Sequence, residues 1–218
     1  MSDALKLRDF AKPALASIAN RSGRVLYSAA ATLRPGSIYL LGLNPGGDPA
    51  THPDTVAESL CELPNRTLNA YLDESWSGQA VGCSRLQRRV CWLVQQLGFN
   101  VREVCAANLI FIRSSDSTGS GYPKLAELCW PVHERILRIV QPKAVVVFGN
   151  SGVSPFRFLQ AHYGAADLVS FPSGHGAWQC FGFTASTGTK VVGLPHLSRY
   201  AVNKHRDVAG WVKEYAAL

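Results

Sequence analysis

The sequence has six cysteines, but none of them forms a Cys-x-x-Cys pair. A disulfide framework or a zinc ribbon needs cysteines at such close spacings, so neither framework fits this chain. We expect the thiols to be reduced, as they are in a cytosolic protein. We also expect no metal site and no cofactor.

Long apolar runs are absent as well. No stretch approaches the ~18 apolar residues of a membrane-spanning helix. Residues 1–12 mix charged side chains with single apolar ones, and they have no apolar core of the kind found in a signal peptide. The sequence therefore predicts a cytoplasmic protein without a membrane partner, and we expect it to be a monomer.

Acidic residues are scarce relative to basic ones. Asp and Glu number 15 against 22 Lys and Arg, which gives a net charge of +7. Charged residues are only 17% of the chain, too few for a solvated disordered protein. An excess of positive charge favours a polyanionic partner, most commonly nucleic acid, although many basic domains bind no polyanion.

Several enzyme motifs are missing. There is no Walker loop, no G-x-G-x-x-G after a strand, and no H-x-E with P-C-x-x-C of the zinc deaminases. The segment Gly149-Asn150-Ser151-Gly152 misses the nucleophile elbow G-x-S-x-G by one position, so Ser151 is interpreted as a helix-start residue.

The hydropathy pattern predicts one α/β domain over residues 1–218. Short apolar runs alternate with segments of helical periodicity, which is typical of a mainly parallel sheet covered by helices on both faces. We therefore expect a three-layer α/β/α fold around that sheet. The expected strands are 37–43, 104–112, 144–148, 179–185 and 190–194. The expected helices are 4–20, 85–97, 125–140, 154–162 and one that begins near residue 202.

Unusual polar segments follow the expected strands. They cover residues 44–48, 113–121, 149–154 and 196–200. In folds of this class the active site lies beyond the carboxyl ends of the strands. We therefore expect these four loops to converge on one site.

Three ordered segments resemble the uracil-DNA glycosylase superfamily. Gly42-Leu43-Asn44-Pro45-Gly46 is similar to its first motif, in the form G-x-N-P-G of the mismatch-specific and single-strand-selective branches. Residues 108–149 are similar to the central region of the iron–sulfur branches. Residues 193–199 resemble the second catalytic motif H-P-S, with Leu197 in place of the proline. The resemblance spans residues 38–211 and implies the uracil-DNA glycosylase-like form of the three-layer fold.

Some residues depart from the family pattern. Ile112 stands where the iron–sulfur branches have a cysteine, and Cys129 alone cannot hold a cluster, so we expect none. Asn44 occupies the place where some branches have a water-activating carboxylate. The motif around His196 is shifted relative to H-P-S.

The resemblance implies hydrolysis of the bond between a flipped-out base and its sugar. Asn44 and His196 would be the catalytic residues. Asn44 would hold the attacking water through its side-chain carbonyl, with Asp48 as the alternative water activator. His196 would donate a hydrogen bond to the base as negative charge collects on it.

Six residues would bind the substrate. Asn108 can present a donor and an acceptor, a pair that matches uracil and mismatches cytosine. Ser198 and the backbone at Gly46-Gly47 would hold phosphates. Arg199 or Tyr200 would fill the space that the base leaves. The substrate-binding residues are Gly42, Pro45, Gly46, Asn108, Ser198 and Arg199.

Each of these roles has a structural alternative. Asn44 could shape a turn, Asn108 could be a core amide, and His196 could be a surface histidine, in which case His175 is the next candidate. The base-stacking residue stays open among three aromatics that are more often core residues: Tyr71, Trp76 and Phe111.

The sequence thus leads to a hypothesis of a DNA base-excision repair glycosylase that acts on uracil or a related deaminated base. The alternative is a non-catalytic DNA- or nucleotide-binding relative on the same fold. A third interpretation, a flavodoxin-like binder of small ligands, leaves the positive charge unexplained. The preferred base and the preference for single- or double-stranded DNA stay open.

Overall fold

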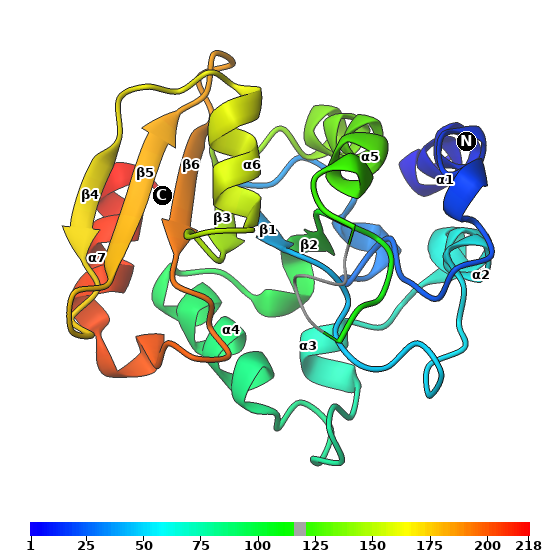
Figure 1. Cartoon of the computed structure of the whole chain (residues 1–218), viewed down its shortest axis with the longest axis horizontal. Helices are drawn as coiled ribbons and strands as arrows, with labels where there is room; N and C mark the ends of the chain where they lie inside the picture. The colour runs from blue at the N-terminus through cyan, green and yellow to red at the C-terminus, as the bar shows by residue number, and fades with distance from the viewer. Residues whose placement is uncertain (116–120) are drawn as a thin grey trace.

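The computed structural model describes residues 1–115 and 121–218 and is built around a six-stranded sheet (Figure 1). The strand order is β2-β1-β3-β6-β5-β4. The first four of these strands run parallel, and β5 and β4 are antiparallel to their neighbours. The strands are β1 Ile38–Gly42, β2 Cys105–Asn108, β3 Ala144–Phe148, β4 Val169–Pro172, β5 Gln179–Thr184 and β6 Lys190–Leu194.

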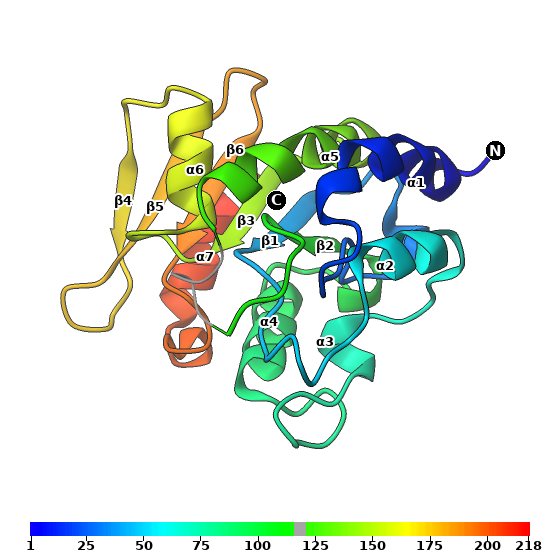
Figure 2. The ribbon, with the colours of Figure 1, turned by 45° about the vertical axis from the view of Figure 1, so that its right-hand side comes forward.

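Helices cover both faces of the sheet and confirm the three-layer α/β/α arrangement. Figures 1 and 2 show α5, α6 and α1 on one side and α4, α3 and α7 on the other. The helices are α1 Asp3–Ala14, α2 Val56–Glu62, α3 Ala70–Asp73, α4 Arg85–Gln96, α5 Lys124–Val140, α6 Pro155–His162 and α7 Arg206–Tyr215.

Apart from Asn108 at the end of β2 and Lys190 at the start of β6, the central strands are apolar because both of their faces are buried. In β1, Tyr39 and Leu41 pack with α1 and α5, whereas Ile38 and Leu40 pack with α4 and α7. Successive side chains of a strand point to opposite faces, so a strand buried on both sides needs an unbroken apolar run. This is why β1, β3 and β6 lie within one residue of the predicted ranges at each end.

Several predicted boundaries were wrong. The first helix ends at Ala14 instead of residue 20, because Pro13 lies in its last turn and leaves no backbone donor there. The second strand ends at Asn108 instead of residue 112, because the chain leaves β2 and bonds to the loop after β1. The last helix begins at Arg206, after a short 3-10 helix, Val202–Lys204.

Two regions had no specific prediction. β4 is an edge strand whose side chains are mostly exposed, so it lacks the apolar signal of the inner strands. The polar stretch 50–82 contains α2, a 3-10 helix Leu63–Asn65 and α3. Part of the loop expected at 113–121 lies outside the described residues. Among the helices that are described, none is long and apolar enough to cross a membrane.

The connections define where a ligand is expected to bind. The chain passes from β1 to its neighbour β2 and then crosses back to β3 on the other side of β1. The order of the strands therefore reverses at β1. In open α/β sheets, ligands bind outside the carboxyl ends of the strands at such a switch point.

Candidate functional site

Four parallel strands end at one edge of the sheet, as the sequence predicted. Gly42 at the end of β1 is in register with Asn108 at the end of β2, and Phe148 of β3 is in register with Leu194 of β6. Neighbouring strands are ~4.8 Å apart, so the ends of β1 and β6, with β3 between them, are roughly 10 Å apart.

The loop after β1 is held by the segment that follows β2. Leu109 N–H donates to the Gly42 carbonyl over 2.9 Å, and Ser114 N–H donates to the Pro45 carbonyl over 3.0 Å. Arg113 adds a hydrogen bond from Nη1 to the Gly46 carbonyl. The first motif is thus fixed along its length by contacts with a segment about 70 residues further along the chain.

Asn44 lies in this loop and is half-buried. Its Nδ2 donates to the carbonyls of Pro45 and Ser114, each over 3.0 Å. Both hydrogens of the amide are therefore used in shaping the loop, as the structural interpretation of Asn44 expected. The same two bonds also fix the orientation of Oδ1, to which no donor within residues 1–115 or 121–218 is bonded. This oxygen is available to accept a hydrogen bond from water.

Asn108 is buried at the end of β2 beside Gly42. Its side chain is only 5% exposed, and its Oδ1 lies so close to Gly42 that a Cβ there would be 2.1 Å from it. Its Nδ2 makes no hydrogen bond of normal length with any described residue, although the amide lies near the Tyr27 hydroxyl. A buried donor without a partner costs ~1–3 kcal/mol. A core amide normally satisfies its hydrogen bonds, so this one does not behave as a purely structural residue.

Tyr27 is a neighbour of Asn108 that the sequence did not bring to notice. It is buried, and burial raises the pKa of its hydroxyl, against which Arg24, Arg113 and the Asn108 amide act. Tyr27 precedes β1 and lies beside β2, where its N–H donates to the Ala106 carbonyl over 2.8 Å. No motif or periodicity marks this segment, so only the folded chain places the tyrosine at the site.

His196 follows β6 and is oriented by the residues next to it. Its Nδ1 lies 2.7 Å from Ser198 Oγ, and Ser198 N–H donates to Nδ1 over 3.3 Å. A nitrogen that accepts from a backbone N–H carries no proton, so the proton of the neutral ring is on Nε2. Desolvation by the surrounding protein and then Arg199 lower the pKa of the imidazole, although His196 is an exposed residue. The neutral ring with an Nε2–H donor is therefore the form present near pH 7.

The loop of His196 is also held from the side by α4. Arg89 Nη1 donates to the Leu197 carbonyl over 2.7 Å and to the Ser198 carbonyl over 3.0 Å. Arg89 is 108 residues from Leu197 along the chain. The sequence periodicity predicted the helix that contains Arg89, but it did not predict the contact with the loop of His196.

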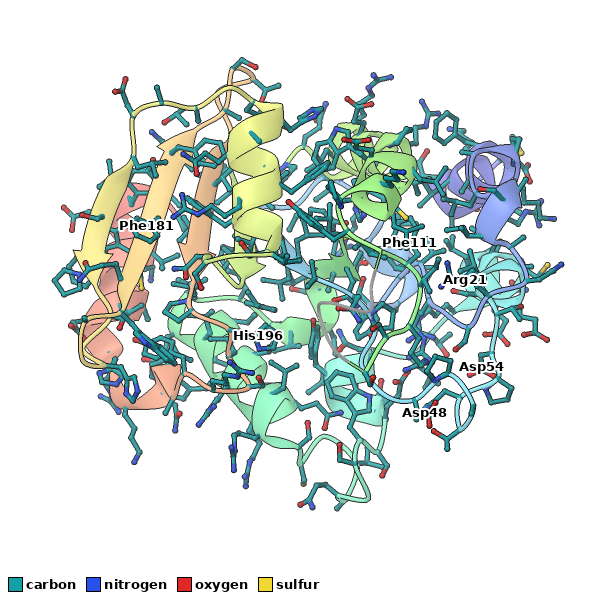
Figure 3. The ribbon with its side chains drawn as sticks, in the orientation of Figure 1. Arg21, Asp48, Asp54, Phe111, Phe181 and His196 are labelled. Carbon is teal, nitrogen blue, oxygen red and sulfur yellow. The ribbon has the colours of Figure 1, made fainter. Side chains whose placement is uncertain are left out.

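Other expected residues are not brought to the strand ends. The Asp48 carboxylate accepts from the Ala50 N–H over 2.9 Å, and Figure 3 shows Asp48 well apart from His196. Tyr200 is fully buried, and its hydroxyl donates to the Ser173 carbonyl over 2.5 Å, so it is not placed to replace a flipped base. Arg199 and Ser198 remain beside His196, with Arg199 exposed.

Of the three candidate aromatics, Phe111 and Tyr71 are buried and Trp76 is half-buried. Phe111 is fully buried, with its ring 4.8 Å from that of His133. The rings of Tyr71 and Trp76 lie 5.9 and 6.0 Å from that of Tyr27, so they form one cluster behind Asn108. Within this cluster, Tyr27 is the aromatic residue whose hydroxyl faces the Asn108 amide.

An ion-pair network from the 50–82 region supports this aromatic cluster. Glu74 binds Arg24 over 2.5 Å and Arg66 over 3.1 Å, and it accepts from Trp76 Nε1 over 3.1 Å. Burial acts to raise the pKa of Glu74, but the two arginines and Trp76 outweigh it and the net shift is downward. The carboxylate stays charged and keeps the tryptophan against Tyr27.

Two surface cavities lie away from these loops, at the amino ends of the strands. One, of about 260 Å³, is lined by residues of α5, α6, β1, β3 and β6, and the other, of about 290 Å³, lies near residues 32–38 and 99–105. Neither cavity includes Asn44, Asn108 or His196. In the part of the chain that the structure describes, no group of three or more His, Cys, Asp or Glu side chains is placed to hold a metal ion.

Comparison with known proteins leaves the site to be interpreted from its own chemistry. No protein-family model matches the chain, and no curated protein matches it in sequence.

Proposed function

We propose that this protein is a DNA glycosylase that hydrolyses the N-glycosidic bond of uracil, or of a related deaminated base, flipped out of DNA. The observation that carries the proposal is the buried Nδ2 of Asn108 at the end of β2, which makes no hydrogen bond of normal length with any described residue. A ligand that offers a carbonyl oxygen would satisfy this donor. Uracil has such an oxygen at the position where cytosine has an amino group, so the donor favours uracil.

His196 supplies a second donor on the other side of the switch point. As the glycosidic bond breaks, negative charge collects on the departing base. The Nε2–H of a neutral imidazole can donate to the base at that stage, and a donor already in place stabilises the transition state without reorganisation. The contacts of Nδ1 with Ser198 support this role, because they keep the Nε2 proton on the free side of the ring.

Asn44 would position the attacking water. An amide is not a useful general base, so its contribution is orientation of the water and not removal of its proton. The fixed Nδ2 hydrogen bonds to Pro45 and Ser114 support this role, because they hold Oδ1 in one direction. The sugar, which becomes positively charged in the transition state, is attacked more easily than a neutral carbon centre.

The test is excision by the purified protein. Labelled oligonucleotides with uracil, hypoxanthine, xanthine or a thymine mismatch are incubated as single strands and duplexes, and abasic sites are cleaved with alkali. Excision of at least one base is expected, together with its loss in Asn108→Ala. His162→Ala is the matched control, because His162 is exposed at the far end of α6. Wild-type protein that excises none of these bases would refute the proposal.

A non-catalytic DNA-binding role is the second candidate. One observation favours it: the carboxylate of Asp48, the alternative water activator, is bonded to its own turn. This candidate predicts tighter binding of DNA that carries uracil than of undamaged DNA, with no abasic product. The same oligonucleotides, assayed for binding and for cleavage, separate the two.

A further inference from the structure

A row of arginines lies on α4 next to the loop of His196. Arg85, Arg88 and Arg89 have the i, i+3, i+4 spacing that places side chains on one face of a helix. Arg89 holds the loop through the carbonyls of Leu197 and Ser198. Figures 1 and 2 both show α4 beside the chain that leaves β6.

The segment that follows the loop continues the positive charge. Arg199, Lys204 and Arg206 are exposed, and the short 3-10 helix and α7 pack against α4. We name these three residues, with Arg85, Arg88 and Arg89, the α4 cationic surface. No ion pair joins any member to an acidic side chain within residues 1–115 and 121–218, although Asp207 lies in the first turn of α7.

Charges gathered without partners on one surface repel one another. The proximity of Arg85 and Arg88, after desolvation, lowers the pKa of Arg89. Other arginines of this chain are neutralised: Arg24 and Arg66 bind Glu74, and Arg102 binds Asp73 over 2.8 Å. The α4 cationic surface is therefore a place where an added anion relieves repulsion.

We propose that the α4 cationic surface binds the sugar–phosphate backbone of the DNA strand beside the target nucleotide. Exposed guanidinium groups spaced along a helix suit consecutive phosphates, and Arg89 keeps this surface in fixed relation to His196. The proposal rests on the proposed function in taking DNA as the polyanion. It goes further by assigning the backbone contact to α4, outside the three segments that carry the motifs.

The proposal is tested by the salt dependence of DNA binding. Each phosphate contact contributes ~0.9 to the slope of log K against log salt for a duplex and ~0.7 for a single strand. Arg85→Ala/Arg88→Ala should therefore lower the slope for an undamaged oligonucleotide by about 1.8 as a duplex or about 1.4 as a single strand. Fluorescence anisotropy at several salt concentrations measures it.

The matched control removes two charges elsewhere. Lys6 and Lys12 are exposed on α1, which Figures 1 and 2 show on the far side of the molecule from α4. Lys6→Ala/Lys12→Ala loses the same net charge and should keep the wild-type slope. His196→Ala should also keep it, because that change removes no phosphate contact.

The outcomes separate this proposal from the proposed function. An unchanged slope in Arg85→Ala/Arg88→Ala, or an equal drop in the α1 control, would overturn the α4 contact even if uracil is excised. A selective drop without any excision would support the contact while refuting the glycosylase. Should the double variant fail to fold, as judged by thermal melting, Arg88→Gln alone should lower the duplex slope by about 0.9.

Discussion

Removal of the His196 imidazole is expected to slow excision while leaving DNA affinity almost unchanged. The negative charge that Nε2–H would stabilise appears on the base only as the bond breaks. An interaction made only in the transition state affects the rate of the chemical step and not the binding of the substrate. His196→Ala should therefore reduce the single-turnover rate with little effect on the dissociation constant.

The size of the effect follows from the geometry of the imidazole. Loss of one preorganised donor costs ~10²–10³ in rate, or about 2.7–4 kcal/mol. The ring is held by two contacts of Nδ1 with Ser198 and by the anchoring of its loop to Arg89, so it needs no reorganisation when the charge appears. The full range is therefore expected. His196→Gln, whose side-chain amide can donate, should keep part of the rate.

The pH dependence gives an independent check. Desolvation and Arg199 lower the pKa of His196 below its usual value of about 6.5. Because the pKa is lowered, the neutral ring is the majority form above pH 6.5. The single-turnover rate should thus not fall as the pH rises above 6.5, and loss of rate through protonation of the ring should appear at lower pH.

Single-turnover kinetics with protein in excess measure the chemical step, and His162→Ala controls for the loss of an exposed imidazole. Full activity of His196→Ala would show that the alignment of the second motif is wrong. The role would then pass to another group, with His175 next in line. Its ring lies 4.7 Å from that of the half-exposed Trp178 in the loop between β4 and β5.

Three further predictions follow from the strand-end geometry. Asn108→Asp should weaken uracil excision and admit cytosine, because an ionised carboxylate accepts a hydrogen bond and cannot donate one; the ratio of the two excision rates measures this. Gly42→Ala places a Cβ 2.1 Å from Asn108 Oδ1, so a loss of roughly 10² in rate is expected, whereas Gly210→Ala, where a Cβ meets nothing within 4 Å, should retain the wild-type rate. Excision should survive excess EDTA, since the sequence has no credible set of metal ligands; loss of activity on chelation would contradict this.

The sequence predicted the inner sheet well because burial on two faces leaves a strong signal. β3 and β6 match the predicted ranges, and each is an apolar run that ends at a turn. β4 was missed because it is an exposed edge strand, in which alternation and apolar residues are both weak. The 50–82 region could not be folded from its sequence because its contacts, such as Arg24 with Glu74, join residues 50 apart.

The same distinction applies to the site. The rule that ligands bind beyond strand ends placed Asn44 and His196 at one edge, since it needs only the strands and their direction. Asn108 was predicted to lie inside the strand 104–112, and it reaches that edge because β2 ends at this residue. Tyr27 and Arg89 escaped prediction because their roles depend on contacts with segments far along the chain. Local sequence patterns identify residues at the ends of strands, but they do not identify the distant residues that contact and hold those ends.

Two arginines of this protein hold the loops of Asn44 and His196, so their positive charge has a structural role. Arg113 donates to the Gly46 carbonyl and to Ser22 Oγ, and Arg89 donates to the carbonyls after His196, so each of the two motif loops is held by a guanidinium. Arg113 is only 8% exposed, so most of this side chain is not accessible to a partner. Its charge supports the loop of Asn44 instead.

The net charge of +7 therefore overstates the number of positive side chains near the site that can bind phosphates. If substitution of Arg113 lowered the slope of log K against log salt, the cause would be collapse of the Asn44 loop. Arg85 and Arg88, which hold no loop, are the positions at which charge can be removed without that complication.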